Sequence, residues 1–310
     1  AGQRFAMRKL LALVAEAKSG KISDAVDLEK SAILIEAFRA TLNNEDLDPA
    51  FREVALTLPS ESMIAEQMDV VDPQLIHAAR QKLRKALAVS LRADWERAYA
   101  QNQTQGTYSP DAASAGKRAL KNVALSYLAE LDDTESHALI HRQCVEANNM
   151  TDRLSALSAL ANSSASAKLD ALAAFYQDFE QEALVIDKWF MLQAMANTTD
   201  VDAMIKLMTH PAFTLKNPNR ARSLLFSFCN GNPSRFHAAD GSGYQFWARQ
   251  VIALNAINPQ VAARLARTLD RWRKYSPPLQ KKMRAALQQV AATPKLSKDV
   301  LEIVTKALAA

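Results

Sequence analysis

Six positions along this chain place a short polar residue directly before a proline, a pairing that is typical of the start of an α-helix. The polar side chain can accept hydrogen bonds from the free amides of the first helical turn. Proline at the first helical position loses no helical hydrogen bond, because an amide there would have no partner inside the helix. The six pairs lie at residues 48–49, 72–73, 109–110, 232–233, 258–259 and 276–277. Thr151, Asp200 and Ser297 are further candidate caps.

The apolar residues between these signals recur at helical spacing. One such stripe consists of Leu154, Leu157, Leu160 and Ala161, and another of Val261, Leu265, Leu269 and Trp272. No segment shows the sustained alternation of a β-strand, and only 7 of the 310 residues are glycine. We therefore predict an all-α fold of a dozen or more short helices. An irregular superhelical array of antiparallel helix pairs, a HEAT/armadillo-like solenoid, would bury so many one-faced helices. A compact helical bundle is the alternative.

The composition excludes several classes of protein. With 49% hydrophobic and 23% charged residues the chain should fold, because disordered chains are less hydrophobic and more highly charged. No apolar run approaches the roughly 20 residues of a membrane span. The two cysteines, Cys144 and Cys229, cannot form a disulfide framework. We expect no membrane association and a reducing, cytoplasmic location.

The charges are distributed unevenly along the chain. Residues 211–310 carry 16 Lys and Arg against 4 Asp and Glu, which is +12, whereas residues 1–210 carry a net charge of −7. An asymmetry of this size suggests that the basic end meets anionic groups. Nucleic acid, an acidic protein surface and a peptide carboxylate all remain possible partners, and a merely solvated basic surface explains the charge equally well.

No catalytic motif can be found in the sequence. It lacks HExxH, a Walker loop, GxSxG and GxGxxG. His137 and His141 are four residues apart and Cys144 follows three later, but no third metal ligand follows at the usual spacing. Packing or surface roles are favoured for these residues. We therefore expect neither a metal nor another cofactor in this chain.

Several longer strings, in order along the chain, resemble the bacterial aminopeptidase N family of M1 zinc metallopeptidases. They are 146–152 (EANNMTD), 187–190 (DKWF), 217–224 (NPNRARSL), 236–244 (FHAADGSGY), 258–265 (NPQVAARL) and 282–287 (KMRAAL). The order and spacing agree over the whole chain, and such a series is far more specific than one short motif. The resemblance is to the C-terminal helical domain of the family.

The resemblance implies a role without catalysis. The family's catalytic domain carries HExxH with a distant glutamate as third zinc ligand, and the GAMEN strand that holds the substrate amine. This sequence contains neither motif. We expect residues 1–310 to form a single helical-repeat domain, the C-terminal domain of a longer aminopeptidase, with the catalytic domain absent and the zinc held there. The resemblance further implies that this domain closes a substrate cavity that admits peptides and excludes folded proteins. Its partners would be the catalytic domain and peptide substrates.

The resemblance also suggests substrate-binding residues. It places Arg222 and Arg264 near the cavity, with Gln260 one helical turn before Arg264. Guanidinium groups suit this place, because they pair well with a peptide carboxylate and stay charged. Asn219 and Arg220 could belong to the same lining. The alternative is that these arginines cap helix ends or bridge neighbouring repeats.

A function of a different class is an independent helical-repeat scaffold that binds acidic proteins or nucleic acid through its basic end. The basic residues are spread singly over many predicted helices and form no dense tract with interleaved aromatics. That pattern argues against nucleic acid as a partner. If the chain is a domain of a larger enzyme, some leucines or aromatics of its N-terminal half should be unusually exposed, where the catalytic domain docks.

Overall fold

The computed structural model describes residues 2–19 and 31–309, and the regular structure in these ranges is helical. The one β-type pairing described is an isolated parallel bridge between Val71 and Tyr275. The predicted all-α class is therefore confirmed. The helices are short, as predicted.

The chain divides into two compact units, which are described separately. The first unit comprises residues 1–64 and 75–174, and the second comprises residues 65–74 and 175–310. Helices of the first unit are α1 (Gly2–Lys18), α2 (Ala32–Asn43), α3 (Pro49–Leu56), α6 (Arg92–Gln101), α7 (Ala112–Leu128), α8 (Thr134–Glu146) and α9 (Met150–Ala161). Helices of the second unit are α11 (Ala183–Ala194), α12 (Val201–Met208), α13 (Pro218–Ala221), α14 (Ser227–Gly231), α15 (Pro233–Phe236), α16 (Ser242–Ile257), α17 (Pro259–Ala266), α18 (Pro277–Ala291) and α19 (Lys298–Ala309). Both units contribute residues to α4 (Glu61–Glu66), α5 (Pro73–Ser90) and α10 (Lys168–Phe179).

Several predicted caps are confirmed by the hydrogen bonds at the helix starts. The Asp48 side chain accepts from the amides of Ala50 and Phe51 at the start of α3. Asn258 accepts from the Val261 amide before α17, and Asp200 accepts from the Ala203 amide before α12. The proline at the first position of α3 and α17 leaves these bonds undisturbed.

Asn232 and Ser276 precede α15 and α18 as predicted, but neither side chain accepts a hydrogen bond from the helix amides. Two predicted helix starts are misplaced. The helix predicted after Ser109 and Pro110 begins later, because Asp111 accepts from the Ser114 amide and caps α7. Thr151 lies inside α9, since Asn149 accepts from the Asp152 amide and caps that helix. In both places a nearby Asp or Asn reaches the free amides, and these residues are at least as good caps as Ser and Thr.

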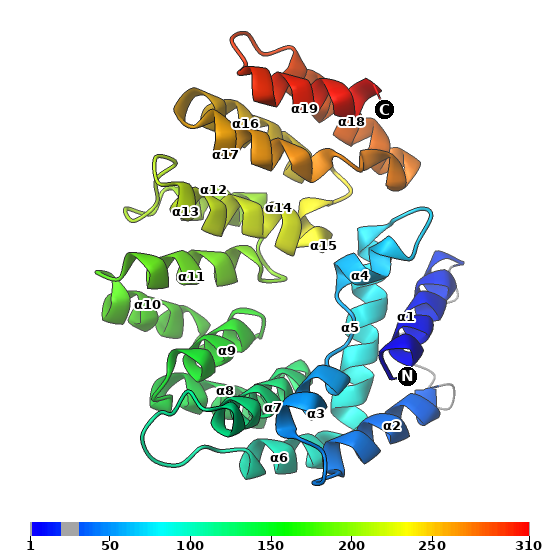
Figure 1. Cartoon of the computed structure of the whole chain (residues 1–310), viewed down its shortest axis with the longest axis vertical. Helices are drawn as coiled ribbons and strands as arrows, with labels where there is room; N and C mark the ends of the chain where they lie inside the picture. The colour runs from blue at the N-terminus through cyan, green and yellow to red at the C-terminus, as the bar shows by residue number, and fades with distance from the viewer. Residues whose placement is uncertain (1, 20–30, 310) are drawn as a thin grey trace. The chain divides into compact units, whose positions relative to one another are not determined.

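Helix α7 is central to the first unit, where it packs against α3, α6 and α9, while α8 packs on α9 (Figure 1). The Trp95 ring of α6 stacks on the Tyr127 ring of α7, with centroids 4.2 Å apart. The Tyr127 hydroxyl donates to the Leu56 carbonyl at the end of α3, at 2.8 Å. One buried aromatic pair thus ties three helices together without leaving its polar atom unpaired.

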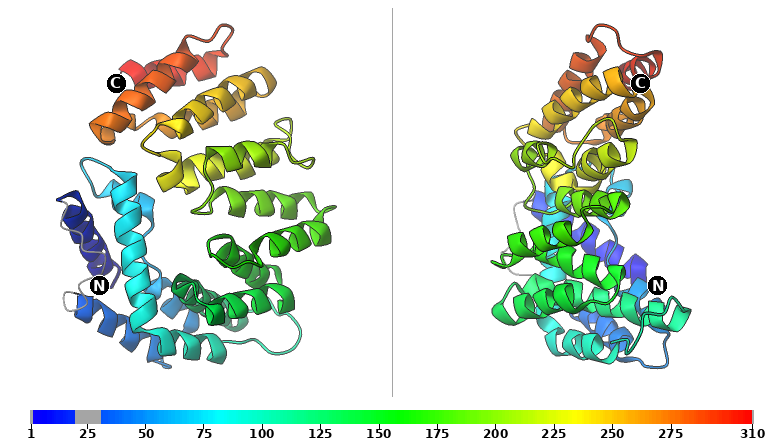
Figure 2. Two further views of the ribbon diagram at one scale, coloured as in Figure 1. Left: turned by 180° about the vertical axis from the view of Figure 1, so that it is seen from behind. Right: turned by 90° about the vertical axis from the view of Figure 1, so that its left-hand side faces the viewer.

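The helices of the second unit are layered in chain order, from α11 in green to α19 in red (Figures 1 and 2). Helix α16 packs on α17 and α18, and α19 packs on both α17 and α18. The predicted stripe of Val261, Leu265, Leu269 and Trp272 is confirmed, since all four side chains are buried. Each helix covers the apolar face of a neighbour, as expected for stacked helix pairs.

Gly243 allows α15 and α16 to approach closely. A Cβ atom on Gly243 would lie 2.0 Å from the carbonyl oxygen of Phe236. That oxygen belongs to the backbone, so it cannot move aside as a side chain would. Gly231 provides a matched comparison, because a Cβ there would meet only atoms of the flexible Met195 side chain.

We predict that Gly243→Ala lowers the free energy of unfolding by about 3 kcal/mol, the upper range for an overpacked site. Gly231→Ala should cost much less, because the thioether can rotate away. Urea unfolding of both variants, followed by circular dichroism, checks the difference. Equal midpoints for the two variants would contradict this reading of the α15–α16 contact.

His237 is a buried titratable group of the second unit. Its side chain is 4% exposed, its Nδ1 atom lies 2.9 Å from the Tyr244 hydroxyl, and its ring stacks on Tyr275. Burial lowers the pKa of His237 to about 3, from 6.5. The folded protein therefore holds a neutral ring at pH values where the unfolded chain binds a proton.

The free energy of unfolding should consequently fall as the pH is lowered from about 6.5 toward 3. Above 6.5 this contribution is fully present, and the slope below it approaches ~1.4 kcal/mol per pH unit. We predict a shallower slope between pH 6.5 and 5 for His237→Gln, which cannot titrate. Urea unfolding at a series of pH values measures both slopes, and identical slopes would show that His237 is not held neutral.

Candidate functional site

A groove lies between α17 and α19 in the second unit, with a volume of about 620 Å³. Its lining comprises Gln260, Ala263, Arg264, Arg267, Asp270, Asp299, Glu302, Ile303, Lys306 and Ala307. Two of the three predicted substrate-binding residues, Gln260 and Arg264, are therefore brought together in one groove.

The amphipathic pattern of α17 places these two side chains outward. Asn258 and Pro259 start the helix, and Val261 and Leu265 are buried on its inner face. Gln260 and Arg264 are four residues apart, so they lie one above the other on the exposed face. The same helical register that buries Val261 and Leu265 therefore directs both polar side chains into the groove.

The charges in the groove are mostly paired. Arg267 Nη1 lies 3.5 Å from Asp270 Oδ2, and Lys306 forms an ion pair with Glu302. Burial raises the pKa of Asp270, whereas the hydrogen bond from Lys306 lowers the pKa of Glu302. Arg264 and Gln260 differ from these pairs, because neither forms a hydrogen bond or ion pair with a residue in the described ranges. Asp299 also lines the groove without such a partner, and Arg264 and Gln260 are the unpaired lining groups that can donate hydrogen bonds to a ligand carboxylate.

Arg222, the third predicted residue, does not line this groove. It begins a π-helical turn, Arg222–Phe226, and its Nε atom is buried without a hydrogen-bond partner among the described residues. Such π-turns occur frequently at functional sites. The neighbouring Arg220 is structural, since it pairs with Asp187 and packs over the Phe190 ring. The sequence string 217–224 therefore supplies one packing arginine and one whose Nε has no partner.

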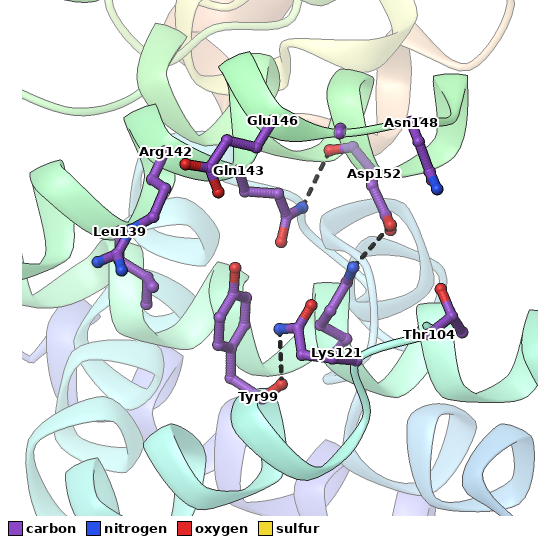
Figure 3. Close-up of a pocket in the computed structure, with 11 residues that line it drawn as sticks. Tyr99, Thr104, Lys121, Leu139, Arg142, Gln143, Glu146, Asn148 and Asp152 are labelled. Carbon is purple, nitrogen blue, oxygen red and sulfur yellow. Dashed lines mark hydrogen bonds and ion pairs between the residues drawn. The ribbon is translucent and has the colours of Figure 1, made fainter. Parts of the chain in front are cut away.

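A second pocket, of about 300 Å³, lies in the first unit (Figure 3). It is lined by Tyr99, Gln103, Thr104, Lys121, Leu139, Arg142, Gln143, Glu146, Ala147, Asn148 and Asp152. No motif in the sequence predicted this pocket. Its one sequence signal was the string 146–152, which supplies four of these lining residues.

The Asp152 carboxylate organises the floor of this second pocket. Lys121 donates to Asp152 Oδ2 at 2.6 Å, and both side chains are about 95% buried. Asn122 and Asn149 donate to the same carboxylate at 2.8 and 2.9 Å. A buried carboxylate is stable only when it is paired and hydrogen-bonded in this way.

The described residues offer no metal site. No three side chains of His, Cys, Asp or Glu come together there in a way that could hold a metal ion. His137 Nε2 lies 2.7 Å from Asp132 Oδ1, within hydrogen-bond distance. Burial raises the pKa of the Cys144 thiol. The donor sets present therefore do not fit a zinc ion. No helix in the described part of the chain is long and apolar enough to cross a membrane.

Comparisons with known proteins give the family. Residues 1–309 match a domain of unknown function with ARM repeats, DUF3458_C. Aminopeptidase N of Escherichia coli is 40% identical over 306 residues, which cover 98% of this chain and 35% of that protein. Aminopeptidase N of Caulobacter vibrioides is 38% identical over 309 residues, covering 99% of this chain and 35% of that protein.

A solved structure agrees with these matches. Aminopeptidase A of Legionella pneumophila, in complex with aspartic acid, superposes with a TM-score of 0.86 at 30% identity, over 98% of this chain and 36% of that one. The chain thus spans about a third of the length of the aminopeptidases it matches. Because the family match runs from residue 1 to residue 309, the chain belongs to the DUF3458_C family of ARM-repeat domains, and its resemblance to the C-terminal helical part of bacterial aminopeptidase N is confirmed.

Proposed function

We propose that this chain is the non-catalytic C-terminal part of a zinc-dependent aminopeptidase that removes N-terminal residues from peptides. In this role it closes the substrate cavity, restricts access to peptides and contributes basic residues to peptide binding. The matches to aminopeptidases over a third of their length support this proposal, as do the absence of HExxH from the sequence and the lack of a fitting donor set among the described residues. The zinc ion belongs to the catalytic domain, and the whole enzyme works in the cytoplasm.

The observation that carries the peptide-binding role is the pair Gln260 and Arg264 in the α17–α19 groove. Arg264 is an exposed guanidinium, and no described carboxylate satisfies it. An aminopeptidase holds the amine end of its substrate, so the carboxylate of a short peptide points away from the catalytic centre. A guanidinium is suited to that carboxylate, because it can donate two parallel hydrogen bonds. Arg222, with its unpaired Nε, is the second candidate for this role.

The catalytic domain is the proposed protein partner. Exposed apolar side chains in the first unit support a docking surface there, as the sequence suggested. Phe51 and Val54 lie three residues apart on α3 and are 58% and 61% exposed. Ile33 of α2 and Val89 of α5 are similarly exposed.

No structural observation favours the scaffold that binds nucleic acid or acidic proteins. The α17–α19 groove carries Arg264, Arg267 and Lys306, but Asp270, Asp299 and Glu302 balance them. A groove with matched charges offers little to a polyanion.

We predict that the pure chain hydrolyses no alanine p-nitroanilide and binds no stoichiometric zinc. The region that precedes this domain in the full-length protein, expressed separately, should gain activity as the chain is added, and the gain should saturate. Absorbance at the nitroaniline band measures the hydrolysis rate, and metal analysis of the pure chain measures the bound zinc. A metal-dependent rate in the chain alone would contradict the non-catalytic role.

We also predict that Arg264→Gln in the full-length enzyme lowers kcat/KM for a tripeptide with a free carboxylate by about tenfold, the worth of one charged hydrogen-bonded contact. The rate for alanine p-nitroanilide should not change, because this substrate has no carboxylate. Arg249→Gln is the matched control, since Arg249 is an exposed arginine of α16 outside the groove. An equal loss for both substrates, or none, would argue against carboxylate binding by Arg264.

A further inference from the structure

The pocket of the first unit has no place in the proposed function, yet it is built like a binding site. It is enclosed by the end of α6, the middle of α7, the end of α8 and the start of α9 (Figure 3). Of the residues that line it, only Leu139 and Ala147 are apolar. Its volume of about 300 Å³ lies at the lower end of the range for small-molecule sites.

A chain of hydrogen bonds fixes the orientation of the Gln143 amide at this pocket. The Asp152 carboxylate can only accept, so Asn122 turns its Nδ2 toward it and presents Oδ1 to the other side. Gln143 Nε2 then donates to Asn122 Oδ1 at 2.8 Å and to the Asp152 carbonyl at 3.0 Å. The Gln143 amide cannot flip without losing both bonds.

Gln143 Oε1 consequently points away from these partners. Figure 3 shows Gln143 and Tyr99 pointing toward one another across the pocket. The Gln143 side chain is buried, at 6% exposure, and Oε1 has no hydrogen-bond partner among the described residues. An acceptor in this position costs about 1–3 kcal/mol unless a donor reaches it. A ligand with an N–H or O–H donor at Gln143 Oε1 would recover this cost.

The rim adds two charges of opposite sign. Arg142 and Glu146 are four residues apart on α8, both are exposed, and neither forms an ion pair or hydrogen bond with another described residue. Below them, Lys121 and Asp152 neutralise each other. The four charges sum to zero, so the pocket favours neither a simple anion nor a simple cation. Burial also raises the pKa of Tyr99, which keeps its hydroxyl protonated as a further donor.

We propose that this pocket binds a small zwitterion of the α-amino acid class. The ammonium group donates to Gln143 Oε1 and faces the Glu146 carboxylate, while the carboxylate of the ligand pairs with the Arg142 guanidinium. Each of the three groups that lack a partner is then satisfied by one small molecule. The inference rests on the first unit alone and does not require the proposed function of the α17–α19 groove.

Titration of the full 310-residue chain with L-alanine, followed by isothermal calorimetry, tests this proposal. We expect saturable binding of L-alanine, and much weaker binding of acetate or ethylammonium, each of which carries one end of the zwitterion. Arg142→Gln and Glu146→Gln should each weaken L-alanine binding at least tenfold. Both residues are exposed, so circular dichroism should show unchanged folding.

Two control variants separate this pocket from the α17–α19 groove. Arg249→Gln removes an exposed arginine outside both pockets, and Arg264→Gln removes the proposed carboxylate ligand of the groove; neither should change L-alanine binding. The proposal is overturned if L-alanine gives no saturable heat, if acetate or ethylammonium binds equally well, or if both rim variants bind as the unchanged chain does. Binding that is lost in Arg264→Gln would place the ligand in the groove and would equally overturn it.

Discussion

Most helices in the described part of this chain are too short to be stable in water without a neighbour. The longest, α5, has 18 residues, and α13 and α15 have four each. Isolated helices shorter than roughly 12–15 residues are marginal, so the stability of the shorter helices comes from covering one apolar face. In the second unit α16 and α17 cover each other, and α18 and α19 extend the stack. Because each helix depends on its neighbours, the residues that cap its ends are important. The cap fixes where the helix begins, and therefore which side chains face the neighbouring helix.

The same dependence explains why polar groups are buried at a few chosen places. At two such places, charged side chains are paired and hydrogen-bonded. The Asp152 carboxylate is bound by three side chains from α7 and from the loop before α9. Arg220 is paired with Asp187 and donates to the Ala183 carbonyl. Gln143 Oε1 and Arg222 Nε are two of several buried side-chain atoms in the described ranges that lack a hydrogen-bond partner, and these two belong to residues of the candidate sites.

The two candidate sites were accessible to sequence reasoning to different degrees. The shared helix face of Arg264 and Gln260 could be predicted, because the cap at Asn258 fixed the helical register, whereas their role in substrate binding stays a prediction from the family resemblance. Arg222 was predicted from a similar string, but the π-turn that it begins leaves no signal in the sequence, and it lies outside the groove. The pocket of the first unit draws on residues from 99 to 152. Those residues meet only after four helices have packed, so spacing along the chain could not reveal them.

The sequence by itself determined the helical class, the positions of several helix starts and the family. These depend on interactions within a few residues, such as a side chain that caps its own helix, or on strings that stay recognisable in any context. It also indicated which face of α17 is buried, since that face follows from the 3.6-residue period. Only the tertiary structure decided which charges pair between helices. Arg220 pairs with Asp187, whereas no described carboxylate pairs with Arg264, because pairing over such separations depends on where neighbouring helices place their side chains.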